Sequence, residues 1–201
     1  MSPDAENKEE NIIDAQAETP VGGYVLVDFG AGRKLERWGD ILVECPDRLA
    51  TGKPSDEHWS ADWVYVQELG RGGHWQPTRS GLPREWQVEV SGQPVICRLD
   101  GQGRVGFRGR ELPCADWVRQ RIEGCYDLDD IRVLNLFAGG GYVTTQALQA
   151  GASVVHVDAS EEMLQLCRAQ AGVQHVEYVH DDVVDYVEDL LRRQLRFDVI
   201  I

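Results

Sequence analysis

The residues with the clearest chemical potential are three consecutive glycines, Gly139 to Gly141, and an aspartate downstream of them, Asp158. Glycine has no Cβ, so its backbone can turn sharply and approach a ligand closely. A helix that begins after such a turn favours an anionic group at its N-terminus. A carboxylate at the tip of the following strand can accept hydrogen bonds from both hydroxyls of a ribose. Together these residues predict a nucleotide-binding site.

The segments around these residues are those that would position them. Apolar residues at Val133–Phe137 predict a strand, and the stretch 142–150 predicts a helix that Gly151 ends. A second apolar run, Val154–Val157, leads into Asp158. The separation between Gly141 and Asp158 is close to the roughly 20 residues expected between the glycine loop and the acid of a nucleotide-binding unit. Strand, glycine turn, helix, strand and acid in this order predict a βαβ unit. The alternative, a purely structural glycine turn with a solvated aspartate, does not account for all five features.

The exact residues narrow the choice of nucleotide. In the dinucleotide fingerprint, Gly139, Gly141 and Thr144 would fill the three glycine positions, so that match is imperfect. Val-Leu-Asn-Leu-Phe-Ala-Gly-Gly-Gly at 133–141 and Gly-Ala-Ser-Val-Val-His-Val-Asp-Ala-Ser at 151–160 resemble class I S-adenosylmethionine (SAM)-dependent methyltransferases. Among these, the sequence is most similar to the bacterial large-subunit (23S) ribosomal RNA methyltransferases. That group typically reads Leu-Asn-Leu-Phe-Ala-Tyr-Thr-Gly-Gly, and this chain departs from it at Gly139, Gly140 and Tyr142.

The resemblance implies a Rossmann-like α/β fold and SAM as the cofactor. It places the methionine end of SAM at Gly139 to Gly141 and the ribose diol at Asp158. It places the adenine edge at Asp182, with Asp181 as the second choice, although Asp182 also fits the N-cap of the next helix. The full set of expected cofactor-binding residues is Asn135, Phe137, Ala138, Gly139, Gly140, Gly141, Asp158, Ala159, Asp181 and Asp182.

Further elements complete four strands of a doubly wound sheet. Ser160 predicts the N-cap of a helix through Met163, and His175–Val179 and Phe197–Ile201 predict the third and fourth strands. The resemblance places the fourth strand beside the first, and an Asp-Pro-Pro-type motif that holds the target base after it. No such motif occurs in the sequence, so the catalytic residues are unknown. We therefore expect an incomplete methyltransferase, doubtful in catalysis, whose sheet edge could pair with another chain in a dimer.

A small β-rich module is expected at residues 21–123, after a disordered acidic tail at 1–20 and before the methyltransferase domain at 124–201. Four closely spaced tryptophans (Trp59, Trp63, Trp75 and Trp86) favour a module core. Pro113 is expected to begin a helix. The predicted strands include Tyr24–Phe29, Ile41–Glu44, Trp86–Val90, Val95–Leu99 and Arg104–Phe107.

Two groups of basic residues are candidates for RNA contact. The first is Arg33, Lys34 and Arg37, and the second is Arg104, Arg108 and Arg110. Such side chains contact phosphates, but charge on a solvated hairpin is the preferred explanation for both groups. The net charge of −14 argues against strong autonomous RNA binding. A ribosomal RNA partner therefore follows mainly from the resemblance.

Composition limits the remaining possibilities. No apolar run approaches the 20 or so residues of a membrane span, and the acidic start lacks a signal core, so we expect a cytoplasmic protein without a membrane partner. The five cysteines form no Cys-x-x-Cys pair, which predicts no metal site and reduced thiols. Two other functions stay open: a non-catalytic SAM-binding remnant or interaction module, and an NAD(P)-dependent oxidoreductase.

Overall fold

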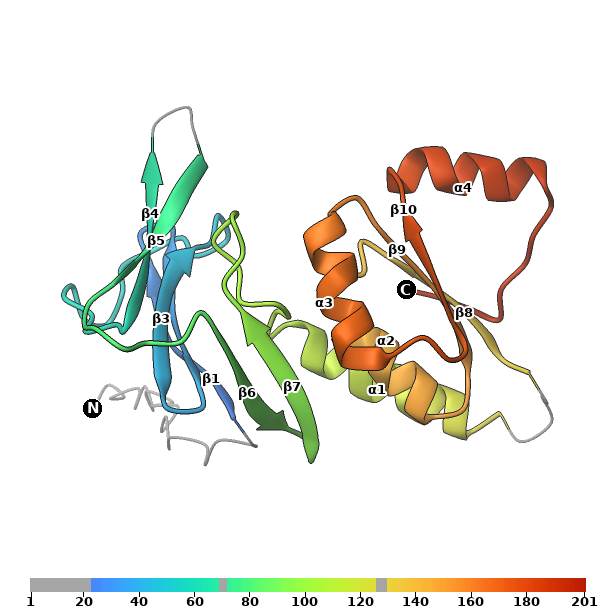
Figure 1. Ribbon diagram of the computed structural model, residues 1–201, viewed down its shortest axis with the longest axis horizontal. Coiled ribbons are helices and arrows are strands. Elements are labelled where there is room, and N and C mark those ends of the chain that lie inside the picture. Colours follow the sequence, from blue (N-terminus) through green and yellow to red (C-terminus); the bar gives the residue numbers. More distant parts are fainter. Residues whose placement is uncertain (1–22, 69–71, 126–129) are drawn as a thin grey trace, which may run out of the picture.

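The computed structural model describes residues 23–68, 72–125 and 130–201. A β-rich part precedes an α/β part with a parallel sheet (Figure 1), which confirms the expected fold class. The expected tail at residues 1–20 lies outside the described residues, as do residues 126–129 of the expected domain junction.

Five strands form the sheet of the β-rich part. They are β1 (Tyr24–Gly30), β2 (Arg33–Trp38), β3 (Ile41–Pro46), β4 (Trp63–Glu68) and β5 (Gly72–Pro77), adjacent in chain order and antiparallel except for β3 and β4. A separate hairpin follows, formed by β6 (Glu85–Val90) and β7 (Gln93–Arg98). Trp63 and Trp75 are buried, as their spacing predicted, and Trp38 is buried completely. Tryptophan packing therefore supplies much of the core of this part.

The segment after β7 corrects one prediction. The strand expected at Arg104–Phe107 is wrong, because the only ladder contact there is an isolated bridge between Leu99 and Val105. Gly106 adopts φ 76°, a value outside the strand region, and its carbonyl lies against Gly140 of the glycine loop. Close packing against the second part thus overrides the local strand preference.

A four-stranded parallel sheet forms the second part. Its elements are β8 (Arg132–Leu136), α2 (Tyr142–Gln149), β9 (Ser153–Asp158), α3 (Glu161–Ala171), β10 (Val176–His180), α4 (Val183–Arg192) and β11 (Val199–Ile200), preceded by α1 (Glu111–Glu123). The strand order is β10-β9-β8-β11, which confirms that the fourth strand of this sheet lies beside the first. Alternate residues face opposite sides: Val133 and Val154 join the cluster with α1 and α2, whereas Leu134 and Val155 pack toward α4.

Local signals set most helix starts in this part. Ser160 caps α3 by accepting from Met163 N, and Asp182 caps α4 by accepting from Val184 N and Asp185 N. The exception is α1, which begins at Glu111 and not at Pro113. Proline still falls within the first turn, where its missing N–H costs no helix hydrogen bond.

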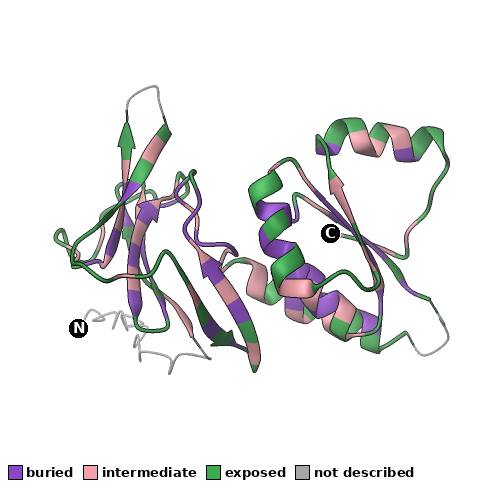
Figure 2. Cartoon of the chain, in the orientation of Figure 1, coloured by how far each residue is buried: buried purple, intermediate pink, exposed green. Residues whose placement is uncertain are grey.

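The two parts share one hydrophobic cluster. The Phe107 ring stacks on Tyr142 at 4.7 Å between centroids and meets the Trp38 ring edge-on at 4.8 Å. The Gln170 side chain accepts from Ile96 N and donates to Pro94 O, each at 2.7 Å. Figure 2 shows buried residues in the β-rich part, in α1 and in the second sheet. These contacts fix the glycine loop against the segment after β7.

Two further observations concern possible partners. Across residues 23–68, 72–125 and 130–201, no helix combines the length and apolar character that a bilayer span requires. The same residues contain no group of three or more His, Cys, Asp or Glu side chains placed to hold a metal ion.

Candidate functional site

Asp158 lies at the C-terminal end of β9 and organises the glycine loop. Its Oδ2 accepts a hydrogen bond from Gly139 N at 2.8 Å, and its Oδ1 accepts one from Ser160 N at 2.8 Å. Each carboxylate oxygen has a second acceptor position. Asp158 can therefore hold the loop and still accept bonds from a ligand.

The three glycines have different tasks. A Cβ on Gly141 would lie 2.1 Å from Cys167 Sγ, and one on Gly140 would lie 2.9 Å from the Gly106 carbonyl oxygen. A Cβ on Gly139 would meet nothing within 4 Å. The protein itself thus requires glycine at the last two positions, and only Gly139 faces open space.

Helix α2 begins at this loop without a side-chain cap. Its N-cap residue is Gly141, with φ 87°, and no side-chain cap bonds the first-turn amides within the described part of the chain. Such amides are orphan donors, and together with the helix dipole they favour an anionic ligand group. A carboxylate or a phosphate is the chemistry that would satisfy this end of α2.

A buried polar chain beneath the loop explains the departure from the dinucleotide fingerprint. Asn135 Nδ2 donates to Thr144 Oγ1 at 3.0 Å, and Thr144 Oγ1 lies 2.8 Å from His156 Nδ1. Burial lowers the pKa of His156 to about 4, so its ring is neutral near pH 7. The third glycine of the fingerprint allows close helix–strand packing, whereas Thr144 uses that position for hydrogen bonding. Asn135 is 3% exposed and turned toward this interior chain.

The other predicted cofactor residues surround the same sheet edge. Ala138 is buried, Ala159 is exposed, and Phe137 is 71% exposed with φ 53°. His180 of β10 is paired with Asp158 of β9, so Asp181 and Asp182 follow at the edge where Asp158 lies. Asp181 Oδ1 accepts from Asp182 N at 2.8 Å, and Asp182 caps α4. The capping alternative for Asp182 is thus confirmed, and an adenine contact stays a prediction.

Comparisons with known proteins identify this arrangement. A family model described as "Methyltransferase domain" matches residues 133–201. The SAM-dependent methyltransferase from Agrobacterium tumefaciens is 28% identical, with a TM-score of 0.76 over 90% of this chain and 59% of that chain. Residues 133–201 are therefore similar to a methyltransferase domain, and the second part of the chain has the class I methyltransferase fold.

Two other solved structures share the fold alone. A protein of Streptococcus mutans classed as a SAM-dependent methyltransferase is 16% identical, with a TM-score of 0.65 over 92% of this chain and 52% of that chain. SMU.776, classed as a methyltransferase and complexed with SAH, is 16% identical, with a TM-score of 0.63 over the same shares. The chain thus spans between half and three-fifths of these relatives. Among curated proteins, none matches it.

One acid close enough to Asp158 for their charges to interact has no counterpart in the sequence prediction. Glu111, the first residue of α1, has a buried Oε2 without a hydrogen-bond partner among the described residues. Burial raises the pKa of Glu111 to about 7, against the opposing effect of Arg108, and the nearby charge of Asp158 raises it further. A glutamate in a first helical turn normally signals only a favourable dipole, so no sequence pattern indicates its burial.

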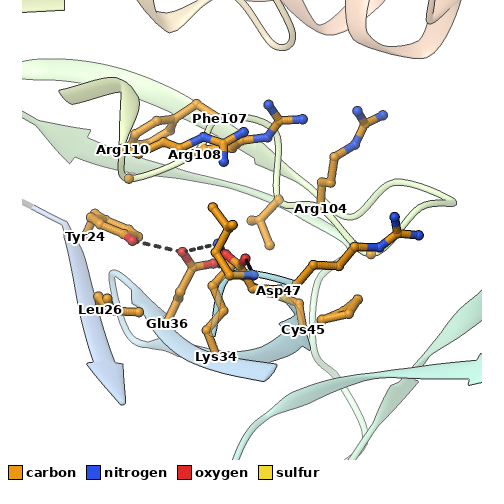
Figure 3. Close-up of a pocket in the computed structure, with 16 residues that line it drawn as sticks. Tyr24, Leu26, Lys34, Glu36, Cys45, Asp47, Arg104, Phe107, Arg108 and Arg110 are labelled. Carbon is orange, nitrogen blue, oxygen red and sulfur yellow. Dashed lines mark hydrogen bonds and ion pairs between the residues drawn. The ribbon is translucent and has the colours of Figure 1, made fainter. Parts of the chain in front are cut away.

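The predicted RNA-contact residues separate into two sets. Lys34, Arg104, Arg108 and Arg110 line one cavity of about 460 Å³, drawn in Figure 3. Arg33 instead pairs with Glu44 at 2.5 Å, and Arg37 is exposed outside that cavity. Arg48, which sequence reasoning missed, also lines the cavity. It follows the β3 strand in a turn, without any basic neighbour in sequence that would draw attention to it.

Proposed function

We propose that this chain binds SAM at the glycine loop and serves as the donor-binding part of a methyltransferase. The observation that carries this proposal is the joint placement of Asp158, an uncapped α2 and the glycine loop at one edge of the parallel sheet. Asp158 suits the ribose diol of SAM, and the α2 N-terminus suits its carboxylate. The glycine loop lets the backbone approach the part of SAM that joins these two groups.

Each residue in this site has a binding task. The α2 N-terminus and the Gly139–Gly141 loop would receive the methionine carboxylate, and Asp158 would accept from the ribose hydroxyls. Asp181 or Asp182 would face the adenine edge. When bound, SAM supplies an electrophilic methyl group, so the protein's task is to align a nucleophile in line with it.

Calorimetric titration tests this assignment. We expect wild-type protein to bind SAM and SAH but not NAD. Asp158→Asn should weaken SAM binding about tenfold to hundredfold, since charge-assisted hydrogen bonds are lost. Asp116→Asn, on the surface of α1 beside Arg119, serves as the matched control. Equal SAM affinities for wild type and Asp158→Asn would contradict the assignment, and preferential NAD binding would support the oxidoreductase.

We further propose RNA, of the ribosomal class, as the methyl acceptor. The support is the set of basic side chains that the fold gathers in one cavity, on a segment that also contacts the glycine loop, in an otherwise acidic chain. Transfer of a tritiated methyl group from SAM to unmodified ribosomal RNA, with transfer RNA and a protein mixture as competing acceptors, tests the substrate class. Label found in protein alone would refute an RNA acceptor. SAM binding without transfer to any acceptor would favour a non-catalytic module.

A further inference from the structure

A cavity separate from the glycine loop lies between β1–β3 and the segment from Gly103 to Arg110. Figure 3 shows Arg104, Arg108 and Arg110 along one side and Lys34, Glu36 and Cys45 along the other. Its volume, about 460 Å³, falls within the range of roughly 300–1,000 Å³ typical of small-molecule sites. The cavity is therefore larger than a bare inorganic ion requires.

Its charge is opposite to that of the chain. Lys34 and four arginines line it, against two acids, Glu36 and Asp47. Glu36 is 2% exposed and already bonded, because it accepts from Tyr24 Oη at 2.8 Å and pairs with Lys34 Nζ at 2.7 Å. The lining is thus clearly cationic in a protein whose net charge is −14. A concave cationic site of this kind concentrates anions.

Three of the arginines form no ion pair with any described residue, although the charges of Arg108 and Arg110 act on the nearby Glu111 carboxyl. Within the described parts of the chain, no ion pair involves Arg48, Arg108 or Arg110. Arg104 pairs with buried Asp100 through Nε, but its Nη2 is buried without a hydrogen-bond partner among those residues. A buried guanidinium donor without an acceptor is costly. An external acceptor in the cavity would satisfy it.

The cavity shares a wall with the methyltransferase site. The segment that carries Arg104, Arg108 and Arg110 also places the Gly106 carbonyl against Gly140 and the Phe107 ring against Tyr142. A ligand held by these arginines would therefore contact the same segment that packs against the loop where the methyl donor is proposed to bind.

We infer that this cavity binds a phosphate group of a single-stranded nucleic acid, presented to the adjacent methyltransferase site. Guanidinium groups suit phosphate because their planar donors match its oxygens in pairs. Two exposed apolar side chains at the rim, Leu26 and Leu49, offer contact for a ribose or a base. The inference rests on the proposed nucleic-acid substrate, but phosphate binding to the cavity can be measured in the absence of SAM.

Fluorescence anisotropy with a labelled ten-nucleotide single-stranded RNA tests this site on the full chain. The triple variant Arg48→Ala, Arg108→Ala, Arg110→Ala removes only arginines that form no ion pair within residues 23–68, 72–125 and 130–201. The control variant Lys53→Ala, Arg192→Ala, Arg193→Ala removes the same charge from exposed positions outside the cavity. Arg104 is left intact, because its removal would leave the carboxylate of Asp100, which is 0% exposed, without its cationic partner.

We expect each lost phosphate contact to weaken RNA binding about tenfold and to reduce the salt slope by about 0.7 to 1. The control triple should keep most of the affinity, and both variants should stay folded and keep the SAM affinity of wild type. Equal RNA affinity and slope in wild type and cavity variant would overturn the inference. Tight binding of inorganic phosphate or a mononucleotide, with no gain from strand length, would overturn the nucleic-acid source.

The two proposals fail separately in this design. Wild type that binds RNA through the cavity but does not bind SAM would sink the proposed function and support the phosphate site. If wild type binds SAM but the cavity variant binds RNA as tightly as wild type does, the proposed function is supported and the phosphate site is refuted.

Discussion

Replacing Glu111 by Gln should raise the free energy of unfolding above pH 7 and leave it almost unchanged at pH 4. In the folded state the pKa of Glu111 is raised from 4.5 to about 7, chiefly by burial. Between those values the unfolded chain has lost the proton that the folded chain retains, so stability falls as the pH rises through this window. At 1.36 kcal/mol for each pH unit, the full cost above pH 7 is about 3 kcal/mol. Gln, neutral at every pH, avoids that cost.

His156 contributes the opposite slope and sharpens this test. Its pKa is lowered from 6.5 to about 4 by burial, so the unfolded chain takes up a proton below pH 6.5 that the folded chain refuses. Stability contributed by His156 is therefore lost as the pH falls from 6.5 to 4. From pH 4.5 to 6.5 the slopes from Glu111 and His156 oppose one another in wild type. Glu111→Gln should reveal the rising His156 slope alone.

Urea denaturation at pH values from 4 to 9 measures these curves. The control is Glu123→Gln, an exposed acid at the other end of α1, which should follow the wild-type curve. The reasoning fails if Glu111→Gln and wild type differ by the same amount at pH 4 and pH 8. It also fails if wild-type stability rises steadily between pH 6.5 and 8.

Two further variants test contacts in the fold. Gly141→Ala should destabilise the protein by several kcal/mol more than Gly139→Ala, because a Cβ at Gly141 would overlap Cys167 Sγ while one at Gly139 meets open space. Both glycines have positive φ, which costs an alanine about 1–2 kcal/mol at either position. The difference between the two variants in thermal denaturation therefore measures the overlap alone. Arg104→Ala should cost about 3 kcal/mol or more because buried Asp100 loses its cation, and a loss below 1 kcal/mol in urea denaturation would refute that role.

Short-range patterns predicted the methyltransferase part well. The βαβ unit, the caps at Ser160 and Asp182 and the position of Asp158 all depend on neighbours within a few residues or on one periodic pattern. The family resemblance also predicts the observed position of the fourth strand beside the first. In such elements local preference and final structure agree.

Long-range contacts explain what the sequence did not predict. The Arg104–Phe107 segment has strand-like composition, but Gly106 packs against Gly140, more than 30 residues away. The burial of Glu111 and the approach of Arg48 to Arg108 likewise depend on how the β-rich part meets the rest of the chain. No periodicity or local motif in the sequence indicates these tertiary contacts.

The contact between the Gly106 carbonyl and Gly140 has a thermodynamic consequence. There is no room there for even one additional carbon atom, so displacement of one backbone displaces the other. This contact directly connects the glycine loop, which we propose receives the methyl donor, to the segment that carries the cavity arginines, which we propose bind phosphate. By linkage, whatever factor the donor applies to phosphate affinity, phosphate must apply to donor affinity. The total binding free energy of donor and phosphate would therefore be the same whichever ligand binds first. The order of addition would change only the rates of binding.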